Sequence, residues 1–321
     1  MKATFYKLMI ALILVATFSG CSKEEELSDS IFDTTDVELD PKSYTYKFDL
    51  FLRNNYLKPY NLKFKYQMED SGTDMDYNLV PASYDNSKKL AVLVKYLWFD
   101  VYAKVVNPAF LKKYGPRIIH LIGSPAYNPA NGTMILGLAE GGIKVSLFRV
   151  NSIEVNNVDM LNEFYFKTMH HEFAHILHQN KSYPSEFNLI SYKHYSPFDW
   201  QDRDDKVAAS LGFASPYGGS QTREDFVEII ANYIVKTDAQ WNTLLLNASK
   251  DWKVDESTGV VTEDTDTDAD GVDGQKVILN KLSICRTWLA DSYGINLDAL
   301  RAEVQLRQKN IDMDSLLSEI E

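Results

Sequence analysis

Residues 169–178 have the sequence MHHEFAHILH and hold four of the six histidines of this 321-residue chain. The stretch contains the pattern H-E-x-x-H, from His171 to His175. An α-helix turns about 100° per residue, so residues four positions apart share a face and both imidazoles can bind one metal ion. Glu172, one position further round, can act as a general base toward a water on that metal. The opposite face is apolar and carries Met169, Phe173 and Ile176. The pattern therefore predicts a helix with one metal-binding stripe and one core stripe.

A third protein ligand is needed, because a catalytic zinc ion takes three and keeps its fourth position open. His178 shares the face but lies about 10 Å along the axis from His171, too far to bind the same ion. We therefore expect His178 to support the site or to be structural. The extended metzincin motif is absent, because His178 stands at its glycine position and Lys181 at its third histidine. A carboxylate from a later helix is then the expected third ligand.

The candidate carboxylates lie in the segment Glu224-Asp225-Phe226-Val227-Glu228, which begins 49 residues after His175. Glu224 and Glu228 are four positions apart and share a helix face. A glutamate ligand with a second acid one turn away would supply both a metal bond and its support. We expect this helix to begin near Thr222, because Thr222 to Asp225 resembles a capping box with Asp in the place of Glu or Gln.

The remaining sequence mixes helical and strand patterns, which favours an α+β fold. Helices are expected over 87–106, 159–180, from about 222 onward, and twice within 275–321 with a break near Gly294. Strands are expected over 118–122, 134–138 and 144–150, the last two as a hairpin. The strand over 144–150 is also our candidate to pair with an extended substrate.

The N-terminus has the pattern of an export signal. Lys2 and Lys7 precede an apolar run over 8–18, and Ser19-Gly20-Cys21 follows. This run is too short to span a bilayer. We predict that 1–20 is a lipoprotein signal peptide and that Cys21 is lipidated; an ordinary signal peptide is the alternative. Residues 21–40 are expected to form an acidic flexible tether, and 41–321 the catalytic domain. Lysine and acids directly after Cys21 resemble a signal for the outer face of the outer membrane.

The net charge excludes one class of partner. The whole chain carries 33 basic and 45 acidic residues, a formal charge of −12. Such a chain repels phosphate unless it has a basic patch, and the sequence shows none. We therefore expect no nucleic-acid partner.

Residues 255–274 are an acidic stretch with eight acids and no Lys or Arg. Asp266, Asp268 and Asp270-Gly271 resemble the start of a calcium loop, but the twelfth position is Val277 rather than Glu. We favour a solvated loop insertion, with a calcium-regulated adhesin as the weaker alternative. Cys285, in an apolar helical stretch, is expected to be a buried small hydrophobe.

The spacing of H-E-x-x-H and E-D-F-x-E resembles a gluzincin metallopeptidase. The spacing from Tyr217 to Glu224 and Glu228 is similar to the site of the anthrax lethal factor type, although the rest of the chain resembles that family very little. The resemblance implies that His171, His175 and Glu224 bind the metal and that Glu228 supports Glu224. It also implies that Tyr217 donates to the transition state; an ordinary turn tyrosine before Gly218-Gly219 is the alternative.

A closer resemblance covers nearly the whole chain after Cys21. It is carried by the segments 59–61, 121–124, 137–142, 170–179 and 224–228, and it is to a zinc-binding metallopeptidase family of lipoproteins found beside TonB-dependent nutrient importers. The resemblance implies a zincin-like domain, one Zn²⁺ per chain and a peptide or protein substrate. A TonB-dependent transporter and its surface lipoprotein are then possible partners. Two alternatives stay open: a non-catalytic accessory lipoprotein, and a zinc hydrolase of another bond.

Overall fold

The structure is a computed structural model that divides into two units, Met1–Ser43 and Tyr44–Glu321. The described residues are 38–68, 78–128, 132, 134–135, 137–140, 143–255, 257–265 and 270–321. The predicted signal peptide, Cys21 and most of the predicted tether lie outside them. Among the described helices, none is both long and apolar enough to cross a membrane. The unit Tyr44–Glu321 carries the residues of interest.

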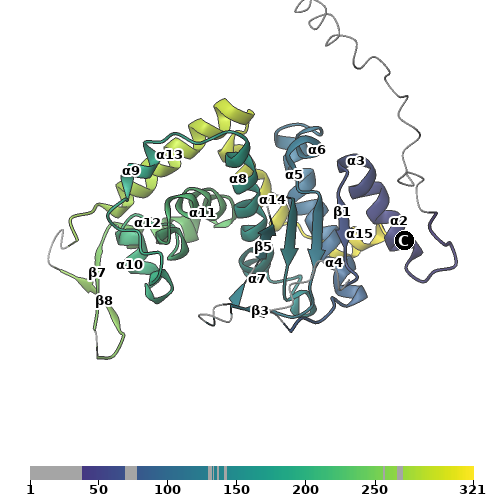
Figure 1. The fold of residues 1–321 in the computed structure, drawn as a ribbon, viewed down its shortest axis with the longest axis horizontal. Helices are drawn as coiled ribbons and strands as arrows, with labels where there is room; N and C mark the ends of the chain where they lie inside the picture. Colours follow the sequence, from purple (N-terminus) through teal and green to yellow (C-terminus); the bar gives the residue numbers. More distant parts are fainter. Residues whose placement is uncertain are drawn as a thin grey trace, which may run out of the picture. The chain divides into compact units, whose positions relative to one another are not determined.

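A four-stranded sheet lies at the centre of this unit, in the order β1-β2-β6-β5 (Figure 1). The first three strands run parallel and β5 runs antiparallel to β6. The strands are β1 (Lys63–Lys65), β2 (Ile118–Leu121), β5 (Gly137–Glu140) and β6 (Lys144–Leu147). Two pairs lie apart from it, β3 (Ala126–Tyr127) with β4 (Met134–Ile135) and β7 (Asp251–Val254) with β8 (Val261–Asp264).

The sheet order corrects one expectation and confirms another. The hairpin over 134–150 is present as the β5–β6 pair, although β4 separates from it and pairs with β3. The proposed pairing of strand 144–150 with a substrate is wrong, because β6 is hydrogen-bonded to β2 on one side and to β5 on the other. Its backbone groups are therefore already used, and the antiparallel edge strand is β5.

Two long helices frame the sheet, and each contains one π-helical segment. The first runs through α4 (Tyr84–Val94), η2 (Lys95–Phe99) and α5 (Asp100–Val105), and it begins at Ser83, whose hydroxyl accepts from the Asn86 N–H. The second runs through α7 (Val158–Leu161), η4 (Asn162–Phe166) and α8 (Lys167–Asn180). Both predicted helices are confirmed. Single π turns of this kind are frequent near functional sites.

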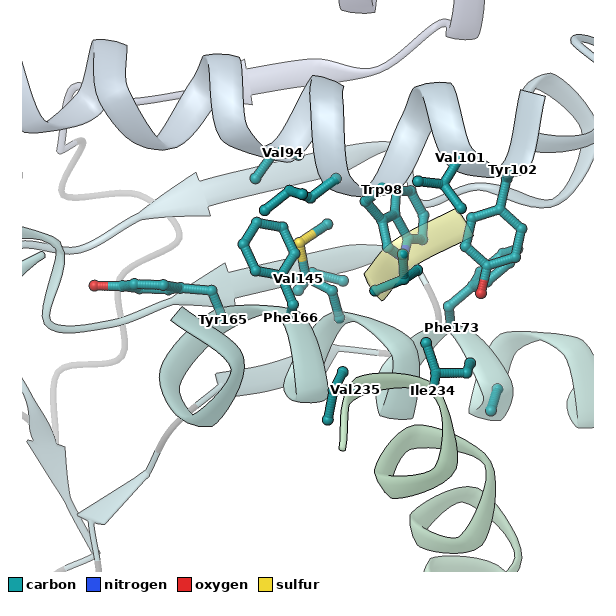
Figure 2. Packing of buried hydrophobic residues seen from close by; sticks show 14 of the residues in the cluster. Val94, Trp98, Val101, Tyr102, Val145, Tyr165, Phe166, Phe173, Ile234 and Val235 are labelled. Carbon is teal, nitrogen blue, oxygen red and sulfur yellow. The ribbon is translucent and has the colours of Figure 1, made fainter. Parts of the chain in front are cut away.

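The core forms where these two helices meet the sheet (Figure 2). Trp98 on η2 and Phe173 on α8 pack edge to face, with ring centroids 5.1 Å apart. Figure 2 shows Val94, Trp98 and Tyr102 pointing from the first helix toward Phe166 and Phe173 on the second, beside Val145 of β6. The predicted core stripe of residues 169–176 is confirmed: Met169, Phe173 and Ile176 are buried. Burying this stripe fixes the rotation of α8, so its opposite stripe faces α11.

The C-terminal part is helical, as expected. α13 (Gly274–Tyr293) ends at Gly294, whose left-handed backbone (φ +68°) closes the helix, and α14 (Leu297–Gln308) follows. The structure adds a third short helix, α15 (Met313–Ser318), and places strand β8 inside the segment expected to be a loop. Asp266 and Asp268 of the possible calcium loop lie outside the described residues. Cys285 is buried, as predicted.

The other described elements are short, apart from two helices beside the site. These two are α11 (Thr222–Val235) and α12 (Asp238–Ala248). The short ones are α2 (Tyr46–Leu52), η1 (Arg53–Leu57), α3 (Lys58–Tyr60), α6 (Phe110–Tyr114), η3 (Val150–Ser152), α9 (Phe187–Ile190), η5 (Trp200–Asp202), α10 (Asp205–Ser210) and η6 (Tyr217–Gly219).

The predicted capping box of α11 is wrong. The N-cap residue is Gln221, and its side chain makes no capping hydrogen bond. Asp225 instead points inward and forms an ion pair with Lys281 of α13 at 2.6 Å, both side chains being fully buried. The Tyr195 hydroxyl also donates to Asp225 (2.7 Å), and Lys281 donates to the carbonyl of Gly212 (2.7 Å). Asp225 therefore joins α11 to α13 and to the chain around 195.

Replacing Lys281 by Met tests this buried pair. The variant leaves Asp225 as an unpaired buried charge, so we expect the free energy of unfolding to fall by about 3–5 kcal/mol. Guanidinium unfolding followed by circular dichroism measures the change. The double variant Asp225→Asn/Lys281→Met should recover part of the loss, and Lys276→Met, an exposed lysine, should change stability by less than about 0.5 kcal/mol. A fully stable Lys281→Met protein would contradict the pairing.

Candidate metal centre

The metal-binding stripe of α8 faces α11. His175 contacts Glu224, His171 contacts both Glu224 and Glu228, and Lys167 contacts Glu228. Residues with higher numbers on α8 contact residues with lower numbers on α11, so the two helices pack antiparallel. The four-residue spacing on each helix places one contact on each turn.

Three side-chain atoms converge at the centre of this contact. The Nε2 atoms of His171 and His175 are 3.2 Å apart, and each lies 3.1 Å from Oε2 of Glu224. The structure thus brings together the three residues predicted as ligands, from two helices 49 residues apart in the sequence.

This triangle has the size and chemistry of a zinc site. Zinc bonds to nitrogen and oxygen of about 2.0–2.1 Å in a tetrahedron place neighbouring ligand atoms about 3.3 Å apart. The three edges here are 3.1, 3.1 and 3.2 Å. Two imidazoles and one carboxylate are also a known donor set of catalytic zinc. The residues therefore fit the metal.

The outer nitrogen of His171 is held by Glu228. The Nδ1–H donates to Glu228 Oε1 at 2.7 Å, which directs the Nε2 lone pair toward the triangle. Glu228 is 2% exposed, and its other oxygen accepts from Ser215 (2.5 Å) and Asn232 (2.9 Å) and lies 3.7 Å from Lys167 Nζ. Burial raises the pKa of Glu228, but Lys167 and His171 outweigh it, and the pKa is lowered. Glu228 was predicted to support Glu224; its hydrogen bond goes to His171 instead.

His178 has the matching role for His175. The Nδ1–H of His175 donates to Nε2 of His178 at 2.8 Å. Burial and the charges of His175 and Arg223 lower the pKa of His178 to about 4, so it is neutral and accepts this bond at neutral pH. His178 was predicted to support the site or to be structural, and its contact is with His175.

Glu172 lies in the same cluster as the two histidines. His171, Glu172 and His175 each offer one ligand atom, and these three atoms lie within 4.8 Å of one another. Burial raises the pKa of Glu172, although both histidines oppose the shift. A carboxyl with a raised pKa beside the triangle suits transfer of a proton during hydrolysis. Glu224, whose Oε2 lies 3.1 Å from both Nε2 atoms, is therefore the candidate ligand, and Glu172 is the candidate base.

Tyr217 borders the triangle on another side. Its ring stacks on that of His171 with centroids 5.8 Å apart, and Trp200 packs against it at 4.9 Å. Burial and the charges of Glu224 and Glu172 raise its pKa, so the hydroxyl stays protonated at neutral pH. The residue is 37% exposed, and its side chain is in hydrogen-bonding contact with Glu224.

Sequence reasoning missed four side chains around the site. Lys167 and Asn232 stand one turn from His171 and Glu228 on the same helix stripes, so helical spacing could have found them. Ser215 lies in a loop and Trp200 in the short helix η5, and no local pattern predicts that they reach Glu228 of α11 or Tyr217.

The chain resembles known proteins over most of its length. Residues 41–298 match the family described as "Putative zinc-binding metallo-peptidase". The chain belongs to this family. It is also similar to the crystal structure of a protein from Bacteroides caccae titled a "putative zinc-binding metallo-peptidase". The two share 38% identity and a TM-score of 0.68, over 89% of this chain and 99% of the other. No curated protein matches the chain. The zincin-like α+β fold predicted from sequence is confirmed.

Zinc affinity tests the ligand assignment. Glu224→Ala removes one corner of the triangle and should release most of the zinc. Glu228→Gln removes the negative charge of the group that accepts the His171 Nδ1–H and should weaken zinc binding by about 10–100-fold. Competition with a chromogenic chelator measures both, with Glu263→Gln, an exposed carboxylate, as the control. If Glu224→Ala kept full zinc occupancy while Glu228→Ala lost it, the assignment would be reversed.

Proposed function

We propose that this protein is a zinc-dependent peptidase that uses one Zn²⁺ per chain, held by His171, His175 and Glu224. The observation that carries the proposal is the 3.1–3.2 Å triangle of ligand atoms with Glu172 beside it. A site that only stores metal has no use for a general base. When bound, zinc would polarise the scissile carbonyl and lower the pKa of a water toward about 7.

The chain's own residues supply the proton transfers. Glu172 takes the proton of the attacking water and passes it to the amine that leaves, which breaks the C–N bond. Tyr217, protonated at neutral pH, donates a hydrogen bond to the oxyanion that develops on the carbonyl. Glu228 and His178 hold the two imidazoles in one tautomer throughout.

The substrate backbone is proposed to lie along β5. This strand is the antiparallel edge of the described sheet and lies against α8 (Figure 1). Its outer edge has no strand partner among the described residues. An extended peptide can add to such an edge by main-chain hydrogen bonds, independent of its sequence.

Replacement of Glu172 by Gln tests the mechanism. The amide keeps the shape of the side chain but cannot accept a proton, so the variant should retain about one zinc per chain and lose peptide cleavage by at least about 100-fold. Metal content is measured beside cleavage of a diverse peptide library, with Glu154→Gln, on an exposed loop, as the matched control. We expect the control to behave as wild type.

Two results would move the conclusion to another function. Full cleavage by Glu172→Gln would exclude this residue as the base. Zinc without cleavage in either protein would favour a non-catalytic accessory protein, or a hydrolase of esters or glycosides, which the same preparation can be assayed against.

We further propose that the protein is anchored by Cys21 in the outer membrane, facing outward, beside a TonB-dependent transporter. The support is the charged start, apolar run and Ser19-Gly20-Cys21 of the sequence. Cys21→Ser should abolish incorporation of labelled palmitate and release the protein from the membrane fraction. A Cys21→Ser protein that stays membrane-bound would contradict the lipid anchor.

A further inference from the structure

A cavity of about 640 Å³ opens next to the metal centre. Its wall is formed by the start of the α7–α8 helix, the segment before α11, and the facing sides of α11 and α12. The volume is in the range of small-molecule and side-chain pockets. None of the three metal ligands lines it. Three residues that do line it, Lys167, Ser215 and Asn232, also contact Glu228. One carboxylate therefore separates the cavity from His171.

The cavity lies along the same pair of packed helices as the metal centre, toward the start of α8 and the end of α11. Lys167 precedes His171 by one turn, and Lys236 follows Glu228 by two turns. At 1.5 Å per residue these offsets are about 6 Å and about 12 Å along the helix pair. An extended peptide advances about 3.3–3.6 Å per residue. Measured from the ligand Glu224, Lys236 is twelve residues, or about 18 Å, along the chain of α11. A substrate residue about two to five positions from the cleaved bond can therefore extend its side chain, or its terminal carboxylate, into the cavity.

The two lysines that line the cavity are not equally paired. Lys167 is engaged with Glu228. The Lys236 ammonium has no ion pair or hydrogen bond within the part of the chain that the structure describes. Burial and the charge of Lys167 lower the pKa of Lys236, and they outweigh the opposing charges of three carboxylates, those of Asp205, Glu228 and Asp159. An anion placed between two such groups would relieve their repulsion and form charge-assisted hydrogen bonds.

We propose that this cavity is a substrate subsite for a carboxylate, carried by an acidic side chain or by the free C-terminus of a peptide, with Lys236 as the main contact. The inference rests on the proposed peptidase function and gives it a substrate class. Lys167, which also lies close to Glu228, is the second cation of the subsite.

Three acids, Asp159, Glu163 and Asp205, also line the cavity, and all three are exposed. Asp159 accepts from Gln240 at 2.8 Å. Charges in contact with water are screened and attract or repel weakly, whereas partly buried lysines act at short range in a lower dielectric. We therefore expect the lysines to set the preference, and a basic peptide is the competitor that the test must include.

The test uses zinc-loaded full-length mature protein and matched pentapeptides. One series is amidated and carries Glu, Gln or Lys at each position in turn; a second compares a neutral peptide as free acid and as amide. We expect kcat/KM for the acidic member to exceed its neutral partner by at least about tenfold at one position. The series that shows the effect identifies the source of the carboxylate.

Variants of Lys236 make the assignment specific. In Lys236→Met the acidic-to-neutral ratio should fall close to one, and in Lys236→Glu the preference should move to the Lys peptide. Lys112→Met, an exposed lysine of α6, changes the net charge equally and should keep the wild-type ratio. Binding of the same peptides to zinc-loaded Glu172→Gln protein, measured by calorimetry, reports the preference without turnover.

The outcomes separate this inference from the peptidase proposal. Cleavage with no charge preference, a preference for Lys, or a ratio unchanged in Lys236→Met would overturn the subsite and leave the peptidase function standing. Charge-selective binding that depends on Lys236, without cleavage by wild type, would support the subsite and overturn the peptidase function. Neither binding nor cleavage would overturn both.

Discussion

The hydrogen bond between Glu228 and His171 is the interaction on which the metal centre depends. A carboxylate that is 2% exposed loses its hydration, and this cost must be offset by partners inside the protein. The partners come from three places: Lys167 and His171 on α8, Asn232 on α11, and Ser215 on the segment that leads to Tyr217. One buried charge thus fixes the antiparallel register of two helices and the position of the loop that brings Tyr217 to the site.

One face of α8 packs into the hydrophobic core, and the opposite face carries the two histidines that contact α11. Phe173 packs into Trp98 and anchors the helix in the core, while His171 and His175 face α11 on the other side. Rotation of α8 by one residue, about 100°, would turn His171 and His175 away from α11 and remove Phe173 from its contact with Trp98. The hydrophobic core therefore determines the geometry of the ligands, because it tolerates only one rotation of the helix.

The sequence predicted those parts of the site that follow from helical periodicity. His171, His175, Glu224 and Glu228 are related by four-residue spacing, so their faces could be assigned without knowing the fold. The strand expected at 144–150 is present as β6, but its predicted pairing with a substrate was wrong, because a strand pattern does not say which strand lies at a sheet edge. The capping box at Thr222 failed because Asp225 gains more from Lys281, 56 positions later, than from a local N–H. Such long-range partners decide between two locally acceptable conformations, and no window of sequence contains them.

Charge along the α8–α11 contact changes with distance from the metal. Next to it the carboxylates of Glu224 and Glu228 face imidazoles, which suits a divalent cation. The cationic side chains lie further along the helices: Lys167 is one turn before His171, and Lys236 is two turns after Glu228. A carboxylate ligand beside the metal would be stabilised by zinc, but a substrate carboxylate there would compete with the scissile carbonyl for the open position. Lys167 lies about 6 Å along α8 from His171, and Lys236 lies about 18 Å along α11 from Glu224, so a substrate anion at the lysines would not be diverted to the metal. The same helix spacing that builds the metal site therefore separates recognition from chemistry.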